Sequence, residues 1–178
     1  MKRVFVMGAA AVGVVLIVVL GLAFAQPDTF KVERDVSIAA RPEAIYSNLD
    51  DFKRWGLWSP WEKLEPTMTK THSGAPTGVG AIYEWDGKEV GSGRMTITDS
   101  KPNEQLTIKL EFTKPFEATN TTVFQLAPRG SDTEVRWIMT GENNFVGKVM
   151  GVFADMDSMV GKDFETGLAA LKQVSESP

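Results

Sequence analysis

Three tryptophans within seven residues are the most pointed chemical feature of this 178-residue sequence. Trp55, Trp58 and Trp61 stand around Pro60. An indole offers a large apolar face and one N–H donor, which suits contact with a flat or ring-containing ligand. The same rings would also serve to close the end of a hydrophobic core and to pack short helices onto a longer one. The cluster marks where a ligand would enter, and both interpretations stay open.

The charged side chains form no recognisable catalytic arrangement. Glu62, Glu84, Arg94 and Arg136 are the charges expected nearest to an internal cavity. Glu84 and Arg94 stand in neighbouring predicted strands, where they are placed to pair. A general acid or base would need a perturbed pKa and a defined geometry that a sequence does not show. We therefore prefer a salt bridge at the rim and predict no catalytic residues.

The inventory of other reactive residues excludes several kinds of site. There are no cysteines, which rules out disulfides, thiolate metal sites and cysteine nucleophiles. The single histidine, His72, carries no serine-nucleophile motif and rules out a His-rich metal site. The loop with Gly74, Gly78 and Gly80 lacks the Lys-Ser/Thr of a phosphate-binding loop. We predict neither a metal nor a cofactor.

One long C-terminal helix must position whatever site exists. Apolar side chains recur there at steps of three and four residues: Met156, Met159, Val160, Phe164, Leu168, Leu171 and Val174. This spacing predicts a helix over 154–174, roughly 30 Å long. Upstream, alternating apolar and polar residues predict strands near 30–38, 68–72, 81–85, 95–97, 106–112, 124–126 and 135–139. Two small helices follow the first strand, so we expect an α+β fold in which a curved antiparallel sheet wraps around the long helix.

The first 25 residues differ in character from the remainder, 26–178, which we take as one domain. Residues 4–25 are uncharged and apolar, long enough as a helix to cover roughly 33 Å, close to the core of a bilayer. They predict either a single-pass membrane anchor or a signal peptide cleaved after Ala25, where Ala23-Phe24-Ala25 supplies a small-x-small site. Lys2 and Arg3 favour an N-terminus held inside, which would place the domain outside the cytoplasm.

The overall charge argues against nucleic acid as a partner. The chain has 19 Lys and Arg against 23 Asp and Glu, a formal net charge of −4. No run of basic residues offers a footprint for phosphates or anionic lipid headgroups. Hydrophobic residues make up 43% of the sequence, which is ample for a core.

Five stretches resemble the bacterial polyketide cyclase-like branch of the SRPBCC superfamily, the helix-grip group that also holds START and Bet v 1-like domains. They are PDTFKVER at 27–34, DFKRW at 51–55, WSPWE at 58–62, GSGRM at 91–95 and MDSMVGKDFETGL at 156–168. The resemblance implies an elongated apolar cavity between the sheet and the long helix, with the two short helices at one mouth. It does not fix a ligand, because this fold carries many functions.

Within such a cavity, large side chains on the inner faces are the predicted lining. On the sheet they are Tyr83, Trp85, Met95, Phe112, Phe116 and Trp137, and on the helix Met156 and Phe164. The alternative is that these residues fill the space as a solid core. We expect a domain that binds a small hydrophobic molecule such as a lipid or polyketide. A polyketide cyclase-type enzyme and a co-chaperone-like interaction module are the alternatives.

The fate of the leader gives the first test. An uncleaved anchor keeps its N-terminal residues in protein isolated from cells and stays in the membrane during carbonate extraction. Mass spectrometry of the intact protein checks this directly. A mature chain starting at Gln26 would replace the anchor by a signal peptide, and exchanging Ala25 for a bulky residue should then change processing.

Overall fold

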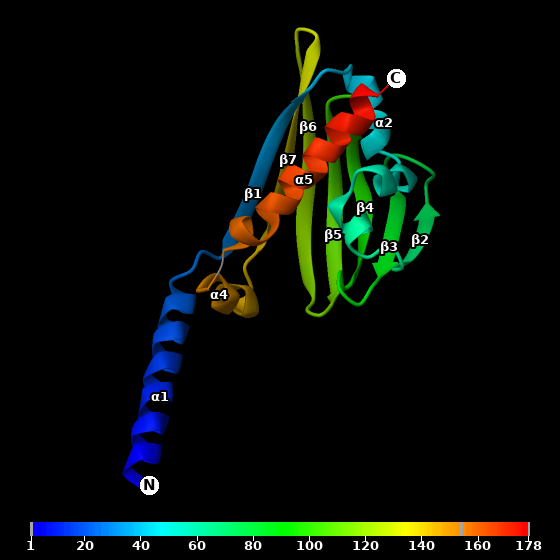
Figure 1. The fold of residues 1–178 in the computed structure, drawn as a ribbon. Coiled ribbons are helices and arrows are strands. Elements are labelled where there is room, and N and C mark those ends of the chain that lie inside the picture. The colour runs from blue at the N-terminus through cyan, green and yellow to red at the C-terminus, as the bar shows by residue number, and fades with distance from the viewer. Residues whose placement is uncertain (1, 154, 178) are drawn as a thin grey trace.

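A seven-stranded antiparallel sheet and a long C-terminal helix make up the domain (Figure 1). The computed structural model describes residues 2–153 and 155–177, with side chains described from residue 13 onward. The elements are α1 (Lys2–Phe24), β1 (Thr29–Ile38), α2 (Pro42–Leu49), the 3-10 helix η1 (Phe52–Leu57), α3 (Pro60–Leu64), β2 (Thr69–Gly74), β3 (Ala81–Asp86), β4 (Ser92–Lys101), β5 (Gln105–Lys114), β6 (Ala118–Arg129), β7 (Asp132–Glu142), α4 (Phe145–Gly151) and α5 (Met156–Glu176).

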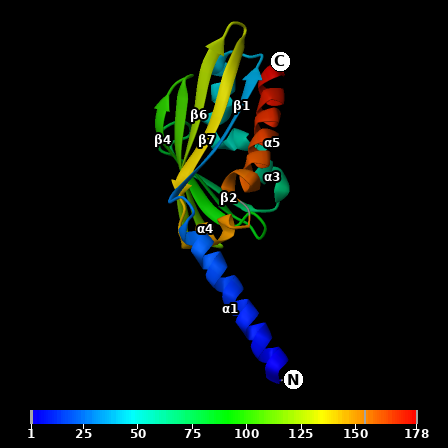
Figure 2. The ribbon, with the colours of Figure 1, turned by 90° about the vertical axis from the view of Figure 1, so that its left-hand side faces the viewer.

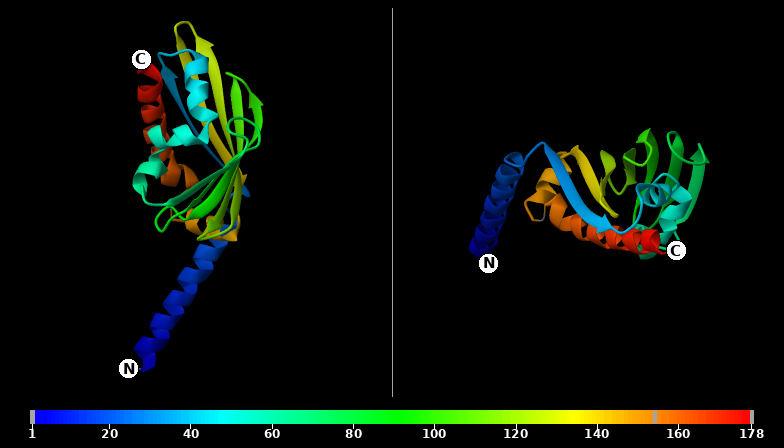
Figure 3. Two further views of the ribbon diagram at one scale, coloured as in Figure 1. Left: turned by 90° about the vertical axis from the view of Figure 1, so that its right-hand side faces the viewer. Right: turned by 90° about the horizontal axis from the view of Figure 1, so that it is seen from above.

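The sheet order β1-β7-β6-β5-β4-β3-β2 confirms the predicted helix-grip fold. From β2 to β7, each strand pairs with the next strand in the sequence. The first strand, β1, pairs with the last strand, β7. Seen from above, the sheet curls, and α5 runs along the open side of the curl (Figure 3). The helix therefore covers the concave face, which is where the apolar residues of alternate strand positions point.

Three features depart from the sequence-based expectation. The segment 60–64 forms its own helix, α3, because Pro60 occupies the first turn and ends the preceding η1. A short helix, α4, precedes α5 and was not predicted. The predicted start of the long helix at Ala154 lies outside the described residues, and α5 as described begins at Met156, capped by the side chain of Asp155.

Arg34 joins the long helix to the first strand. In the alternation of β1, Arg34 occupies a position that otherwise carries apolar side chains. The pairing of β1 with β7 is unbroken, so Arg34 is a charged residue on the inner face and not part of a bulge. Its guanidinium donates two bonds to Asp157, at 2.7 and 3.0 Å, and one to Glu165 at 2.9 Å. These acceptors lie two turns apart on α5, so one side chain fixes both the position and the direction of the helix start.

Aromatic stacking holds the middle of α5 against the sheet. The rings of Trp137 on β7 and Phe164 on α5 are parallel within 11°, with centroids 4.1 Å apart. Two glycines let the helix come this close. A Cβ on Gly167 would lie 2.9 Å from Trp137 Cζ3, and one on Gly161 would collide with the Arg34 guanidinium.

Helix α1 leaves the domain beside α4 (Figures 1 and 2). In the part of the chain with described side chains, no helix is both long enough and apolar enough to cross a membrane. Residues 1–12 of the predicted anchor or signal peptide lie outside that part. The rings of Phe24 and Phe145 approach to 6.4 Å and join α1 to α4.

The Arg34 contacts give a pH-dependent prediction. The hydrogen bond from Arg34, reinforced by its charge, lowers the pKa of Asp157 below the usual 3.8. A lowered folded-state pKa means that the stabilisation is present above about pH 4 and is lost as pH falls through the folded-state value. Asp157→Asn should therefore lower the free energy of unfolding at pH 7, and the difference from the natural chain should shrink below pH 4.

Urea unfolding at a series of pH values measures this difference. Asp163→Asn, on the same helix and in no ion pair among the described residues, is the matched control and should have little effect at any pH. An Asp157→Asn difference that stays constant down to the acid limit would show that the contact with Arg34 does not stabilise the fold.

Candidate functional site

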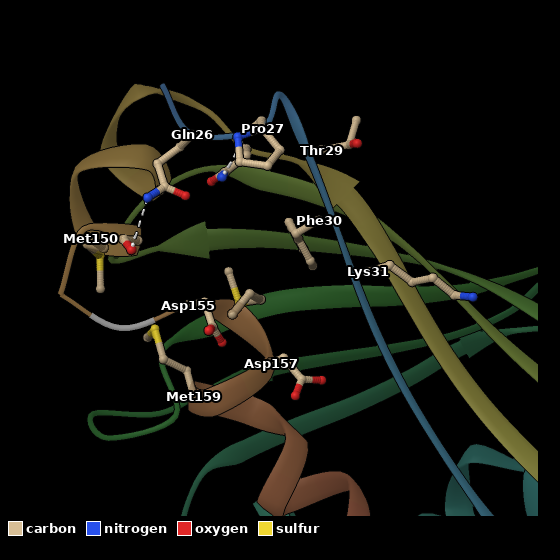
Figure 4. Close-up of a pocket in the computed structure, with 13 residues that line it drawn as sticks. Gln26, Pro27, Thr29, Phe30, Lys31, Met150, Asp155, Asp157 and Met159 are labelled. Atoms are coloured by element: carbon tan, nitrogen blue, oxygen red, sulfur yellow. Dashed lines mark hydrogen bonds between the residues drawn. The ribbon is translucent and has the colours of Figure 1, made fainter. Parts of the chain in front are cut away.

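A pocket of about 230 Å³ opens between the start of α5, helix α4 and the start of β1 (Figure 4). Three methionines, Met150, Met156 and Met159, form its helical wall, and Phe30 of β1 points into it from the opposite side. Thioether side chains are unbranched and adapt to ligands of different shape. The remaining lining residues are Gln26, Pro27, Thr29, Lys31, Asn143, Gly147, Gly151, Asp155 and Asp157.

Several polar groups of this pocket are engaged in holding its walls. The amide of Asn143 donates to the Pro27 carbonyl at 3.1 Å, and the Gln26 amide donates to the Gly151 carbonyl at 3.4 Å. Asp155 caps α5 by accepting from the Ser158 N–H at 2.7 Å. Asp157 is bound to Arg34. The surface that remains for a ligand is therefore mainly apolar.

The predicted tryptophan mouth is placed in the core. Trp58 is 0% exposed and Trp55 is 3% exposed. Their indole N–H groups donate to the backbone carbonyls of Asn48 and Leu49, each at 3.0 Å. Trp61 is half-buried and meets Trp137 and Phe164 edge to face. This arrangement favours the packing interpretation for Trp55 and Trp58, while contact of any of the three with a ligand stays a prediction.

Two of the predicted lining residues stack on each other and fill the space near the helix. Trp137 is 2% exposed and lies between Phe124 and Phe164, with ring centroids 4.8 and 4.1 Å away. Its indole N–H has no acceptor among the described residues. In this part of the domain the solid-core alternative describes what is seen.

Further along the sheet the inner face is less well covered. Trp85, Met95 and Phe112 lie there half-buried on three neighbouring strands. A Cβ on Gly93 would meet the Trp85 ring at 2.5 Å, so this glycine leaves room for the indole against the sheet. Phe116 was expected on this face, but it lies exposed beyond the end of β5, because the chain turns at Pro115.

A buried carboxylate stands at the other side of the inner face. Glu62 on α3 has 8% of its side chain exposed; it accepts a hydrogen bond from Tyr83 and pairs with Lys70 Nζ, each at 2.5 Å. Burial, then the bond to Glu62, raises the pKa of Tyr83 well above its usual value. Tyr83 therefore stays protonated and keeps its O–H pointed at the carboxylate. Glu62 is the predicted cavity charge that does face inward.

The other charges expected near the cavity lie on the outer face. Arg94 and Glu84 do pair, at 2.6 Å, but on the strand positions that point away from the helix. Arg136 contacts Glu33 and Glu134 on the same outer face. Among the described residues, no group of three or more His, Cys, Asp or Glu side chains could hold a metal ion.

His72 borders a second pocket, of about 220 Å³, between η1 and strands β2 and β3. Its ring lies 5.0 Å from that of Tyr83. The pocket walls include Asp51, Lys53 and the backbone of the 73–76 turn. This pocket is more polar than the one beside α4.

Comparisons with known proteins place the chain in a family. Residues 29–176 match the model of the family described as polyketide cyclase/dehydrase and lipid transport. The chain belongs to this family. No curated protein matches the sequence.

Solved structures share the fold of this polyketide cyclase/dehydrase and lipid-transport domain. The protein CV1439 from Chromobacterium violaceum is 16% identical with a TM-score of 0.62, over 86% of this chain and 100% of that one. A protein from Thermobifida fusca is 20% identical with a TM-score of 0.62, over 82% and 92%. DynU16, a putative protein in the dynemicin biosynthetic locus, is 14% identical with a TM-score of 0.58, over 85% of this chain and 48% of its own.

Most residues of the observed pocket escaped the sequence analysis. Of the predicted ligand-binding residues only Met156 lines it. Gln26 and Pro27 fall in a linker, and α4 was not predicted, so no periodic pattern connected them. One signal in the sequence is the grouping of Met150, Met156 and Met159 around the start of the long helix, because methionines form adaptable walls.

The core position of Trp58 leads to a test of its role. Trp58→Ala removes a fully buried ring that meets Phe124 and Trp137 edge to face, at 5.9 and 5.6 Å. We expect a loss of about 3–5 kcal/mol in the free energy of unfolding, the usual cost of truncating a buried aromatic side chain. Denaturant unfolding measures it. Phe116→Ala, an exposed aromatic, should cost far less, and equal effects would contradict the core assignment.

Proposed function

We propose that the domain binds a small hydrophobic molecule, and that the methionine-walled pocket between α4, α5 and β1 receives its apolar part. The observation that carries the proposal is the composition of this pocket. Three thioethers and one phenyl ring face the space, and the side-chain amides of Gln26 and Asn143 donate to backbone carbonyls of its wall. Burial of an apolar ligand against such a surface is favourable, and the surface offers few free hydrogen-bonding groups. The family description, which includes lipid transport, supports the same conclusion.

The size of the pocket limits what it holds. At about 230 Å³ it is smaller than the roughly 300–1,000 Å³ of sites that enclose a drug-sized ligand. It suits one small ring or the end of an acyl chain. A larger ligand would extend over the half-buried inner face formed by Trp85, Met95 and Phe112. The indole of Trp85 beside Gly93 offers an aromatic surface there.

A polyketide cyclase-type enzyme is the second candidate, and Glu62 is the observation that favours it. A nearly buried carboxylate held between a phenol and an ammonium group is an arrangement that can take part in proton transfer. Conversion of a linear polyketide precursor to a cyclised product by the natural chain, but not by Glu62→Gln, would favour the enzyme over the binding domain.

Thermal unfolding with a panel of apolar compounds tests the binding function. The panel contains fatty acids, sterols, quinones and aromatic polyketides. A compound that binds the folded state raises its melting temperature by mass action. Met156→Gln places an amide in the pocket wall, and we expect it to weaken binding of the same compound by about 1–3 kcal/mol, the cost of desolvating an unpaired polar group.

Leu64→Gln is the matched control, because Leu64 is an exposed apolar residue at the end of α3. It should leave the affinity unchanged. Affinities are compared at temperatures where both variants are fully folded, so that stability does not enter. No melting shift with any compound, or equal loss of affinity in the two variants, would end the proposal.

A further inference from the structure

Large apolar side chains gather on the surface at the α4 end of the domain. Phe24 and Phe153 are each 77% exposed, which is unusual for phenylalanine. We call the set that they belong to the α4-end surface. It comprises Phe24 of α1, Phe145, Val146 and Met150 of α4, Phe153 after α4, and Met159 of α5.

Members of this surface from different elements lie close together. Phe24 and Phe145 contact each other across the junction of α1 with α4. Met150 and Met159 reach into the wall of the methionine pocket, so the pocket opens at the same place (Figure 4). By contrast, the other exposed large apolar residues of the domain stand apart from one another. Leu57, Leu64, Val79 and Phe116 lie on η1, on α3 and in two different turns.

The α4-end surface carries no unpaired basic residue within α4, and its neighbouring carboxylates are Asp155, which caps α5, and Asp157, which is paired with Arg34. Lys148 is the one ionisable residue within α4, and its ammonium group is bound to Asp28 at 2.5 Å. This bond also lowers the pKa of Asp28, so the pair stays ionised and internally neutralised. Elements that bind anionic lipid headgroups carry several free Lys or Arg side chains. Here the match is to an uncharged apolar partner.

The neighbouring part of α1 indicates which apolar partner that is. Five successive residues, from Val14 to Val18, are all large, apolar and exposed, so the apolar surface runs around the whole helix. A protein partner covers one face of a helix, whereas a lipid environment covers every face. The same surroundings would then meet the α4-end surface where α1 joins the domain.

We propose that the α4-end surface docks on an uncharged lipid layer, with Phe153 and Phe145 inserted among the lipids and the methionine pocket facing them. Docking of this kind buries apolar side chains to the depth of the headgroup boundary and needs no helix that crosses the membrane. An apolar ligand would pass between lipid and pocket without crossing water. The inference goes beyond the proposed function, because docking does not require that the pocket be filled.

Site-directed labelling tests the proposal, because the chain has no cysteine. In the full chain, Phe153→Cys and Val146→Cys each carry the fluorophore NBD, whose emission moves to shorter wavelength in an apolar environment. Val79→Cys is the matched control, an exposed apolar residue in the turn between β2 and β3. All three positions are exposed, so labelling should leave the fold intact. The labelled chains are mixed with phosphatidylcholine vesicles that contain a lipid with a quencher at headgroup depth.

We expect both α4-end probes to shift to shorter wavelength and to be quenched by the lipid, and the Val79 probe to stay as it is in water. Replacing part of the phosphatidylcholine by an anionic lipid should not strengthen the effect. Three results would overturn the proposal. They are α4-end probes that behave like the Val79 probe, a shift that requires anionic lipid, and a shift without vesicles that grows with protein concentration, which would indicate a second copy of the chain.

The outcome is separable from that of ligand binding in solution. Melting shifts with apolar compounds, combined with probes that remain in water, would leave the proposed function and remove the docking. Probes that are quenched by lipid, without a melting shift for any compound, would leave the docking and remove the proposed function.

Discussion

The close approach of α5 to the inner face of the sheet is the constraint on which the rest of the domain depends. Gly167 helps the helix to lie so near, because a Cβ there would meet the Trp137 ring, and Gly161 leaves room for the Arg34 guanidinium. Once it lies there, Arg34 binds the first turns through Asp157 and Glu165, and Phe164 stacks on Trp137. The helix-grip fold thus has an ionic contact at one end of the interface and an aromatic contact at its centre. The ionic contact holds the helix to β1 and the aromatic contact holds it to β7.

This constraint decides where space remains for a ligand. The stack of Trp137 on Phe164 is enclosed by Trp58 and Phe124, and this part of the interior is filled with rings. Space is left at the start of α5, where the chain enters from α4 and the side chains are flexible methionines. The position of α5 therefore accounts both for the filled interior around Trp137 and for the open pocket at the start of the helix. Met150 and Met159 belong both to the lining of this pocket and to the exposed α4-end surface.

The fold could be predicted from sequence because its signals are periodic. The three- and four-residue steps of α5 and the alternation in β5 each extend over several turns or residue pairs, and the quoted motifs placed them in a known order. The site was harder to predict, for a physical reason. The sequence around Trp58 is the same whether its ring faces a ligand or Phe124. A sequence also does not give the volume that is left between side chains. The pocket also draws on Gln26 and Met150, which lie 124 positions apart and meet through a non-periodic linker and a seven-residue helix. The sequence shows that Arg34 alternates in step with the apolar residues of β1, but it does not show that the partners of Arg34 lie on α5.

Hydrogen–deuterium exchange with and without a bound apolar compound tests the central claim most directly, because it locates the ligand without any substitution. Backbone amides exchange slowly where a ligand reduces local opening. If the pocket between α4, α5 and β1 is the binding site, the compound should slow exchange in residues 26–31 and 145–160 and leave residues 52–64 unchanged. Protection confined to residues 52–64, around the tryptophans of η1 and α3, would contradict the account and restore the tryptophan-lined mouth as the site.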